Sequence, residues 1–198
     1  MKLSKGWITL IVVAIVVLIL FSWGRSTYNN LVSKDEAVKT AWAQVENVYQ
    51  RRADLIPNLV NTVKGVAEFE KSTLQAVIEA RAKATSVQIN PDKLDEASLQ
   101  QFQAAQDDLS GALARLMVVV EAYPQLKATE NFKELQAQLE GTENRITVER
   151  KNYNETAQKY NTYRRSFPSN IFAGIFGFTE KAYFKAAPGT EKAPEVQF

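Results

Sequence analysis

Acidic side chains are the main candidates for chemistry in this chain, because histidine and cysteine are both absent. Without them the chain alone cannot build a thiolate nucleophile, a serine–histidine triad, a disulfide framework or an ordinary zinc site. The acidic pairs Asp107-Asp108 and Glu68-Glu70 carry the oxygen ligands that hard metal ions prefer. Residues one or two positions apart on a helix point in different directions, so neither pair chelates well. We therefore expect no catalytic residue, no cofactor and no metal site.

A second polar group surrounds Pro57, where Arg51, Arg52 and Asp54 gather. Arg52 falls on an apolar seam described below. One interpretation is a polar hinge or a layer that specifies a partner, with Arg52 paired to Glu46 or to a glutamate of another helix. The other is an arginine whose stem lies along the seam while its charged head reaches water. We favour the second interpretation.

The stretch Trp7–Trp23 is the element around which the rest of the chain is organised. From Ile8 to Phe21 its only polar residue is Thr9, and it contains no charge and no proline. Hydrocarbon offers the backbone no hydrogen-bond partner, so such a stretch must be helical, and about 17–25 residues cross a bilayer. Tryptophan at each end suits the headgroup region. After a basic flank at residues 1–6, we expect a single-pass membrane anchor at 7–23, bounded by Trp7, Ile8, Phe21 and Trp23.

A cleaved signal peptide is the competing interpretation, because Lys2 and Lys5 precede the apolar run. The residues that follow, Ser22 to Arg25, contain no small-x-small cleavage site, which favours the anchor. Positive charge tends to stay cytoplasmic, and the N-terminal flank is slightly more basic than the flank containing Arg25 and Lys34. We therefore expect the N-terminus inside and the helical domain outside.

Charge and composition narrow the class of protein. Lys2, Lys5 and Arg25 flank the apolar stretch, so the rest of the chain carries 21 basic against 22 acidic residues. A nucleic-acid-binding face needs a concentrated basic patch, and we expect no nucleic-acid partner. Eight glycines and six prolines are few, as in a chain dominated by helix.

Apolar residues at alternating steps of four and three predict a long first helix with a narrow, coiled-coil-like seam. We expect a polar connector at residues 24–32, a capping box at Ser33 and Glu36, and a helix that continues to Ala84. A kinked but continuous path at Pro57 is favoured over a break near Asp54 that folds the chain back. The seam consists of Val38, Trp42, Val45, Tyr49, Arg52, Ile56, Leu59, Val63 and Val66.

Two further long helices complete the expected all-α bundle of antiparallel helices. Asn90-Pro91-Asp92 is a good start for the second, which Pro124 ends, and Thr129 with Glu130 starts the third, which ends before Ser166. Gln106 and Glu149 occupy seam positions, where a polar group fixes register at a cost in stability. A short fourth helix is expected at 170–176. The bundle domain then spans 33–178, and 179–198 forms an extended tail.

The expected path leaves part of the first helix uncovered. A second helix of about 33 residues runs back only about 50 Å, roughly to the level of Arg52. Each apolar side chain left in water forgoes about 1.5–3 kcal/mol. We therefore expect this part to associate with other copies, through a seam of Val38, Trp42, Val45, Tyr49 and Arg52, unless the helix folds back.

The segment from Ser166 to Phe178 is the most apolar outside the anchor. It could insert into a membrane interface or dock a partner, but capping the open end of the bundle is the interpretation we favour. On the three-helix path it lies far from the membrane, whereas on the fold-back path it returns there. Its apolar residues are Phe167, Ile171, Phe172, Ile175, Phe176 and Phe178.

Three blocks of the sequence resemble the bacterial LemA family. They are KDEAVKTAWAQVENVYQRRADLIPNLVNTVKG, NFKELQAQLEGTENRITVERKNYNETAQKYN and SFPSNIFAGIFGF. The resemblance implies a membrane-anchored helical bundle of the bacterial envelope, without established catalytic residues. Some family members carry a lipoprotein cysteine just ahead of the position of Tyr28-Asn29, which supports an extracytoplasmic domain. Other descriptions of the family place the short N-terminus outside.

These observations lead to a hypothesis of function. We expect a non-enzymatic, membrane-anchored scaffold or adaptor of the bacterial inner membrane, which acts through helix–helix association and forms homo-oligomers, with its domain on the periplasmic side. Its partners would be the lipid bilayer and a membrane protein. The alternative is an accessory subunit of a membrane enzyme complex, in envelope proteolysis or stress response.

Overall fold

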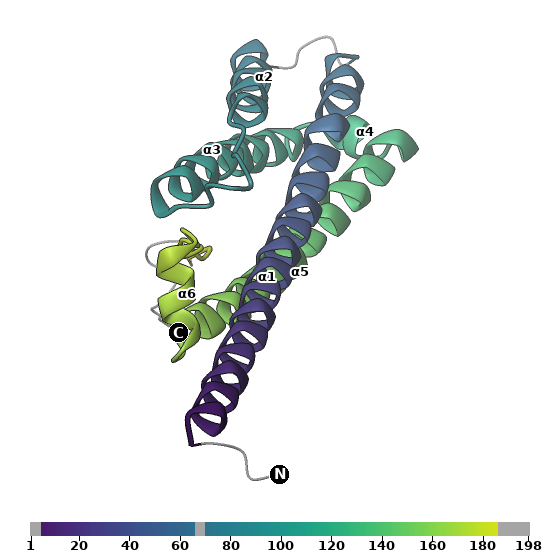
Figure 1. Ribbon diagram of the computed structural model, residues 1–198. Helices are drawn as coiled ribbons and strands as arrows, with labels where there is room; N and C mark the ends of the chain where they lie inside the picture. Colours follow the sequence, from purple (N-terminus) through teal and green to yellow (C-terminus); the bar gives the residue numbers. More distant parts are fainter. Residues whose placement is uncertain (1–4, 66–69, 186–198) are drawn as a thin grey trace, which may run out of the picture.

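The computed structural model describes residues 5–65 and 70–185, and every regular element within them is a helix, which confirms the all-α fold. Figure 1 shows the order along the chain. The helices are α1 (Lys5–Lys64), α2 (Lys71–Ser86), α3 (Glu96–Val120), α4 (Pro124–Lys127), α5 (Glu130–Arg165) and α6 (Ser169–Ile175). A turn at residues 176–177 follows α6 and leads into a segment without regular structure, residues 178–185.

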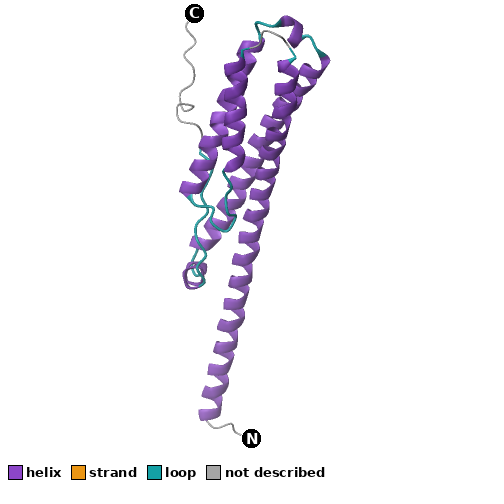
Figure 2. Cartoon of the chain, turned by 90° about the horizontal axis from the view of Figure 1, so that it is seen from above, coloured by secondary structure: helices purple, strands orange, loops and turns teal. Residues whose placement is uncertain are grey.

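Helix α1 is continuous from the apolar stretch into the bundle, so the predictions of a connector at 24–32 and of a helix start at Ser33 are wrong. Thr27 and Leu31 face the bundle and are buried. Packing of this face stabilises the helical conformation of residues 24–32, whatever their local preference. The part from Gly6 onward is long and apolar enough to cross a membrane, and none of its most apolar window is buried within the protein. Figure 2 shows the N-terminal end of α1 projecting beyond the bundle as a single helix.

The same helix passes through Pro57, as the seam predicted. Proline has no N–H to donate to the carbonyl oxygen of Ala53, one turn earlier. Arg81 of α2 supplies the missing donor, because its Nε donates to the Ala53 oxygen over 2.7 Å. The proline is therefore accommodated by a contact between two helices.

The first helix was expected to run to Ala84, and this prediction is wrong. Helix α1 ends at Lys64, next to Gly65, and α2 begins at Lys71 and runs back along α1. Glycine after the last periodic residue and a lysine in the last turn are both stop signals for a helix. At the start of α2, the Glu70 carboxylate accepts hydrogen bonds from the hydroxyl groups of Ser72 and Thr73.

The predicted start of the next helix at Asn90 is also wrong, since α3 begins at Glu96. Asn90 instead forms a turn, in which its Oδ1 accepts from the Asp92 N–H over 2.9 Å. The N-cap is Asp95, whose carboxylate accepts from the Ser98 N–H over 2.8 Å. The start of α5 after Thr129, its end before Ser166 and the short helix α6 agree with the predictions to within a residue.

The long helices pack as two antiparallel pairs, α1 with α5 and α2 with α3. The Lys34 ammonium lies 5.4 Å from the centre of the Tyr163 ring, at the level where α5 ends. The extra reversal between α1 and α2 makes α5 run back toward the apolar end of α1 (Figure 1). The C-terminal helix α6 therefore lies beside residues 23–28 of α1, the outcome expected for the fold-back path.

The buried apolar residues form two clusters along the bundle. The distal cluster, far from the apolar end of α1, includes Ile56, Leu59, Leu109, Leu116, Phe132 and Leu139. The proximal cluster includes Val38, Trp42, Phe102, Ile146, Tyr153 and Phe184. Phe184 and the buried Lys181 belong to the segment predicted as a tail from residue 179. Residues 179–185 are thus part of the bundle, and residues 186–198 lie outside the described residues.

Candidate functional site

A polar layer separates the two apolar clusters, and Arg52 is its centre. Only 1% of the Arg52 side chain is exposed. Its Nη1 donates to Glu143 Oε1 of α5 over 2.6 Å and to Ser110 Oγ of α3 over 2.8 Å. Its Nη2 donates to the side-chain oxygen of Gln106 over 2.7 Å and to the Gln106 carbonyl oxygen over 3.2 Å. One arginine therefore ties α1 to both α3 and α5.

The favoured interpretation of Arg52, with its head in water, is wrong. The guanidinium is buried and also lies 5.1 Å from the centre of the Tyr49 ring. Its acidic partner is a glutamate of another helix, as the alternative interpretation proposed, and Glu46 is not among its partners. Gln106, a predicted polar seam residue, completes the layer and donates to the Ala84 carbonyl oxygen at the end of α2. Glu149 is not part of it and accepts from Asn152.

The predicted association seam is covered by the chain's own helices. Val38, Trp42 and Val45 are fully buried, and Tyr49 is nearly so. The Trp42 ring packs against Phe102, Tyr153 and Phe184, with ring centres 5.2–6.0 Å apart. The premise that this part of α1 lacks a partner within the chain is therefore wrong. Side chains buried in this way are not available to hold a second copy.

A repeated Tyr-Asn pair on α5, at Tyr153-Asn154 and Tyr160-Asn161, holds the C-terminal segment, which comprises residues 179–185. Each asparagine donates to, and accepts from, the backbone of one residue of that segment, Asn154 with Phe184 and Asn161 with Lys181, over 2.8–3.0 Å. The tyrosine hydroxyls donate to the carbonyl oxygens of Ala182 and Thr179.

Asn161 Nδ2 also donates to the Tyr183 hydroxyl over 2.9 Å, but all the other hydrogen bonds of these pairs to the segment recognise backbone rather than side chains. Burial raises the pKa of Tyr160 to about 12, so its hydroxyl remains a donor at neutral pH. Sequence analysis did not single out either asparagine, although a Tyr-Asn pair repeated at a spacing of one heptad is a readable signal.

The same segment is also fastened to α1 by a buried ion pair. The Lys181 side chain is 3% exposed, and its Nζ lies 2.9 Å from Asp35 Oδ1. The Ala182 N–H donates to the Leu94 oxygen over 2.9 Å, in the loop just before α3, and Lys185 pairs with Glu96 in the first turn of α3. Residues 179–185 thus bridge three elements of the bundle.

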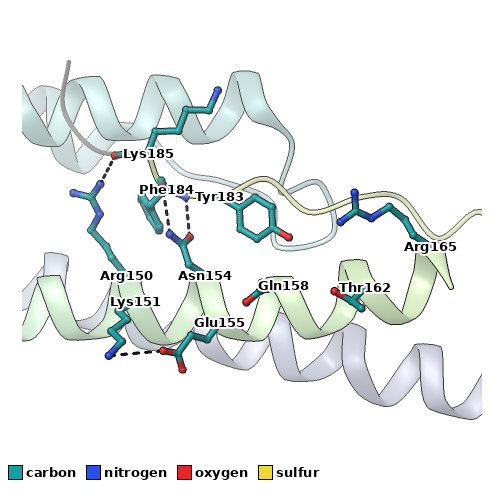
Figure 3. Close-up of a pocket in the computed structure, with 10 residues that line it drawn as sticks. All are labelled: Arg150, Lys151, Asn154, Glu155, Gln158, Thr162, Arg165, Tyr183, Phe184 and Lys185. Atoms are coloured by element: carbon teal, nitrogen blue, oxygen red, sulfur yellow. Dashed lines mark hydrogen bonds and ion pairs between the residues drawn. The ribbon is translucent and has the colours of Figure 1, made fainter. Parts of the chain in front are cut away.

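An open groove of about 610 Å³ runs between α5 and this segment. Figure 3 shows Gln158 and Thr162 at its centre, Arg150 at one end and Arg165 at the other. The Arg150 Nη2 donates to the Lys185 oxygen over 3.0 Å. The other lining residues are Lys151, Asn154, Glu155, Tyr183 and Phe184. Four cationic side chains and one carboxylate line the groove. Lys151 pairs with Glu155, and Lys185 pairs with Glu96 of α3. The excess positive charge therefore lies on Arg150 and Arg165, and it suits an anionic segment of a partner.

The apolar segment 166–178 divides into a packed part and an exposed part. Ser169 and Ala173 are buried, Phe172 packs edge-on against Trp23 with ring centres 5.2 Å apart, and Phe178 contacts the proximal cluster. The exposed large apolar residues are Phe167, Ile171, Ile175 and Phe176. The whole segment was predicted to cap the bundle. Only its packed part does so.

Acidic groups do not converge in the described part of the chain, where no cluster of three or more carboxylates could hold a metal ion. Asp108 pairs with Lys83 over 2.5 Å across the α2–α3 pair. Glu68 lies outside the described residues. The chemistry that the described residues offer is recognition of backbone, charge and apolar surface.

A comparison with family models matches residues 41–198 to the LemA family. The chain belongs to the LemA family. Among its relatives is Magnetosome protein MamQ 2 of Paramagnetospirillum magneticum, 29% identical over 81% of this chain and 65% of that protein. MamQ of Magnetospirillum gryphiswaldense is 27% identical over the same shares, and Protein LemA of Metamycoplasma hominis is 23% identical over 80% of this chain and 69% of its own length. The chain thus spans 65% of the MamQ proteins it matches.

Proposed function

We propose that this LemA-family protein is a non-enzymatic, single-pass scaffold or adaptor of the bacterial inner membrane. In this proposal the apolar part of α1 crosses the bilayer, the bundle lies on the periplasmic side, and the bundle holds a partner protein. The observation that carries the proposal is the continuity of α1 from Lys5 to Lys64. A bundle that shares one helix with its anchor keeps a fixed height above the membrane and a fixed angle to the membrane-spanning part of that helix.

The architecture of the bundle supports a role in holding a partner protein rather than in converting a substrate. Arg52 ties three long helices together, and the C-terminal segment bridges α1, α3 and α5 through Lys181, Asn161 and Ala182. The relatives named MamQ and LemA occur in different bacteria and match over most of this chain. A shared helical module that serves different assemblies is what an adaptor requires.

We propose the basic groove beside α5 as the surface that faces the partner. The partner element would be an extended or helical acidic segment, attracted chiefly by Arg150 and Arg165, since Lys151 pairs with Glu155. This surface replaces the seam of Val38 and Trp42, which the bundle itself covers. Self-association, expected from the sequence, would then use exposed surface or the anchor.

Photo-crosslinking in native membranes tests this proposal. A photoreactive residue at Gln158, in the centre of the groove, should form a crosslink to one partner protein. The crosslink should weaken strongly in the variant K151E/R165E, which reverses two charges of the groove. The control position is Gln75 on α2, whose side chain is exposed and bonded to Glu79. Equal crosslinking from both positions, or no effect of the charge reversal, would contradict the proposal.

The identity of the crosslinked product separates the alternatives. A second copy of this chain would indicate a homo-oligomeric scaffold. A stoichiometric membrane protease or other enzyme would make the protein an accessory subunit instead. Orientation is tested separately: a cysteine at Val118 should react with an impermeant thiol reagent in intact spheroplasts, because the chain has no other cysteine. Protection until lysis would place the bundle in the cytoplasm.

A further inference from the structure

Helix α6 buries its small residues Ser169 and Ala173 and presents its two isoleucines outward, which is the reverse of a helix packed on a water-soluble bundle. Ile171 and Ile175 are four residues apart within α6, so they lie on one side of the helix, and Phe167 lies just before its first residue. The exposed fractions of Ile171, Ile175 and Phe167 are 51%, 70% and 82%, and that of Phe176, next to Ile175, is 53%. Such a group of exposed aromatic and aliphatic side chains marks a surface that meets a partner or a membrane.

The position of α6 points to the membrane. Phe172 packs on Trp23, and the Tyr28 and Phe176 rings meet edge-on with centres 4.8 Å apart. Phe172 also lies so close to Gly24 that a Cβ added there would be 3.1 Å from Phe172 Cε1. These contacts hold α6 against the first turns after the apolar stretch that ends at Phe21.

Geometry then sets the depth of α6. A helix rises about 1.5 Å per residue, so Trp23 lies only about 3 Å beyond Phe21 along α1. If Phe21 marks the end of the hydrocarbon-spanning part, α6 is at the level where headgroups meet acyl chains. Arg25 is exposed on α1 only two residues beyond Trp23, at a level where a cation attracts anionic lipid headgroups.

We infer that α6 is a membrane-interface element, which inserts Phe167, Ile171, Ile175 and Phe176 into the same bilayer that α1 crosses. This inference rests on the proposed membrane anchor. It gives the protein two contacts with one membrane, the span of α1 and the apolar face of α6. The second contact would fix the rotation of the bundle about the α1 axis, which a single span leaves free.

Fluorescence of single-cysteine variants tests the inference in the full-length protein. The chain lacks cysteine, so I175C, V12C and V118C each carry one label, an environment-sensitive nitrobenzoxadiazole. The proteins are reconstituted into phosphatidylcholine–phosphatidylglycerol vesicles with and without spin-labelled lipid. Val12 lies in the apolar stretch, and Val118, 72% exposed on α3, is the matched apolar control in the bundle.

We expect the labels at positions 12 and 175 to be blue-shifted and quenched by spin-labelled lipid, and the label at 118 to be neither. If position 12 is quenched while 175 behaves like 118, the inference is overturned and the anchor stands. If position 12 is not quenched, the proposed anchor itself fails. A label at 175 that is shielded from both lipid quencher and aqueous iodide would indicate a protein partner on α6, which also overturns the inference. The circular dichroism of each variant must match that of the unmodified chain.

Discussion

Arg52 and Glu143 lie 91 residues apart in the sequence and meet at 2.6 Å between the guanidinium and the carboxylate. The arginine is buried, whereas the side chain of Glu143 is 48% exposed. The pair therefore extends from the core to the surface of the bundle. Together with Gln106 it interrupts the apolar packing at one level, where the helices cannot slide past one another without breaking these bonds.

Replacing Arg52 with leucine should destabilise the bundle. The change leaves Gln106 and Ser110 with fewer partners in a buried site, and each such loss costs about 1–3 kcal/mol. Glu143→Gln should cost less, because the amide keeps an acceptor oxygen and its position is half exposed. Urea unfolding followed by circular dichroism in detergent micelles measures both, with E140Q as the exposed control. Equal stability of R52L and the unmodified chain would show that the polar layer contributes nothing to the free energy of unfolding.

Replacing Asn161 with alanine should loosen the C-terminal segment without unfolding the bundle. The variant loses three hydrogen bonds to the segment, two to the Lys181 backbone and one to the Tyr183 hydroxyl, and a hydrogen bond contributes about 1 kcal/mol. Hydrogen exchange at the amides of residues 181–184 should then accelerate by roughly fivefold for each bond lost. N152A is the matched control, because Asn152 is exposed on the same helix and bonds only locally to Glu149. Unchanged exchange in N161A would mean that the segment is held by other contacts.

The N-cap of α3 gives a pH dependence with a definite sign. The Ser98 backbone N–H holds the pKa of Asp95 below its ordinary value of 3.8. A carboxyl group whose pKa is lowered in the folded state contributes its full stabilisation of that state when the pH is above the ordinary pKa. This contribution is lost as the pH falls below the ordinary pKa and through the lowered one. D95N keeps a capping oxygen but does not titrate. The difference in unfolding midpoint between the unmodified chain and D95N should be constant above about pH 5 and shrink below about pH 4; a constant difference throughout would exclude this role of Asp95.

Periodicity predicted the parts of the fold that local signals fix. The all-helical class, the start of α5 after Thr129 and the short helix α6 follow from caps, prolines and apolar spacing. The passage through Pro57 was predicted from the unbroken phase of the seam. What makes it stable, the Arg81 donor to the Ala53 oxygen, comes from another helix and has no sequence signal.

The errors arose where two local signals competed. Asn90 before a proline and Asp95 before Ser98 are both good helix starts, and the structure uses the first as a turn and the second as the cap. Gly65 is a stop signal, yet Leu74 and Val77 continue the apolar spacing because α2 buries the same kind of face. Missing this reversal inverted the path of every later helix. The predicted path therefore left Trp42 exposed, whereas in the structure Tyr153 and Phe184 cover it.

The candidate site was less predictable than the fold. Gln106 and Glu143, the main partners of Arg52, come from 54 and 91 residues away, so spacing cannot reveal them. Asn154 and Asn161 look like ordinary polar positions on α5 until the segment they hold is placed beside them. Such long-range contacts depend on the chain path, which the sequence specifies only through its turns.

The central claim is that α1 joins the apolar stretch to the bundle without a flexible connector. Electron–electron double resonance between spin labels at L18C and N47C, in the full-length protein in vesicles, tests it most directly. A continuous helix predicts one narrow distance distribution near about 44 Å, from a rise of about 1.5 Å per residue. Inserting Gly-Ser-Gly-Ser between Asn29 and Asn30 should broaden the distribution and serves as the control. A broad distribution centred at shorter distances in the chain without the insertion would contradict the claim.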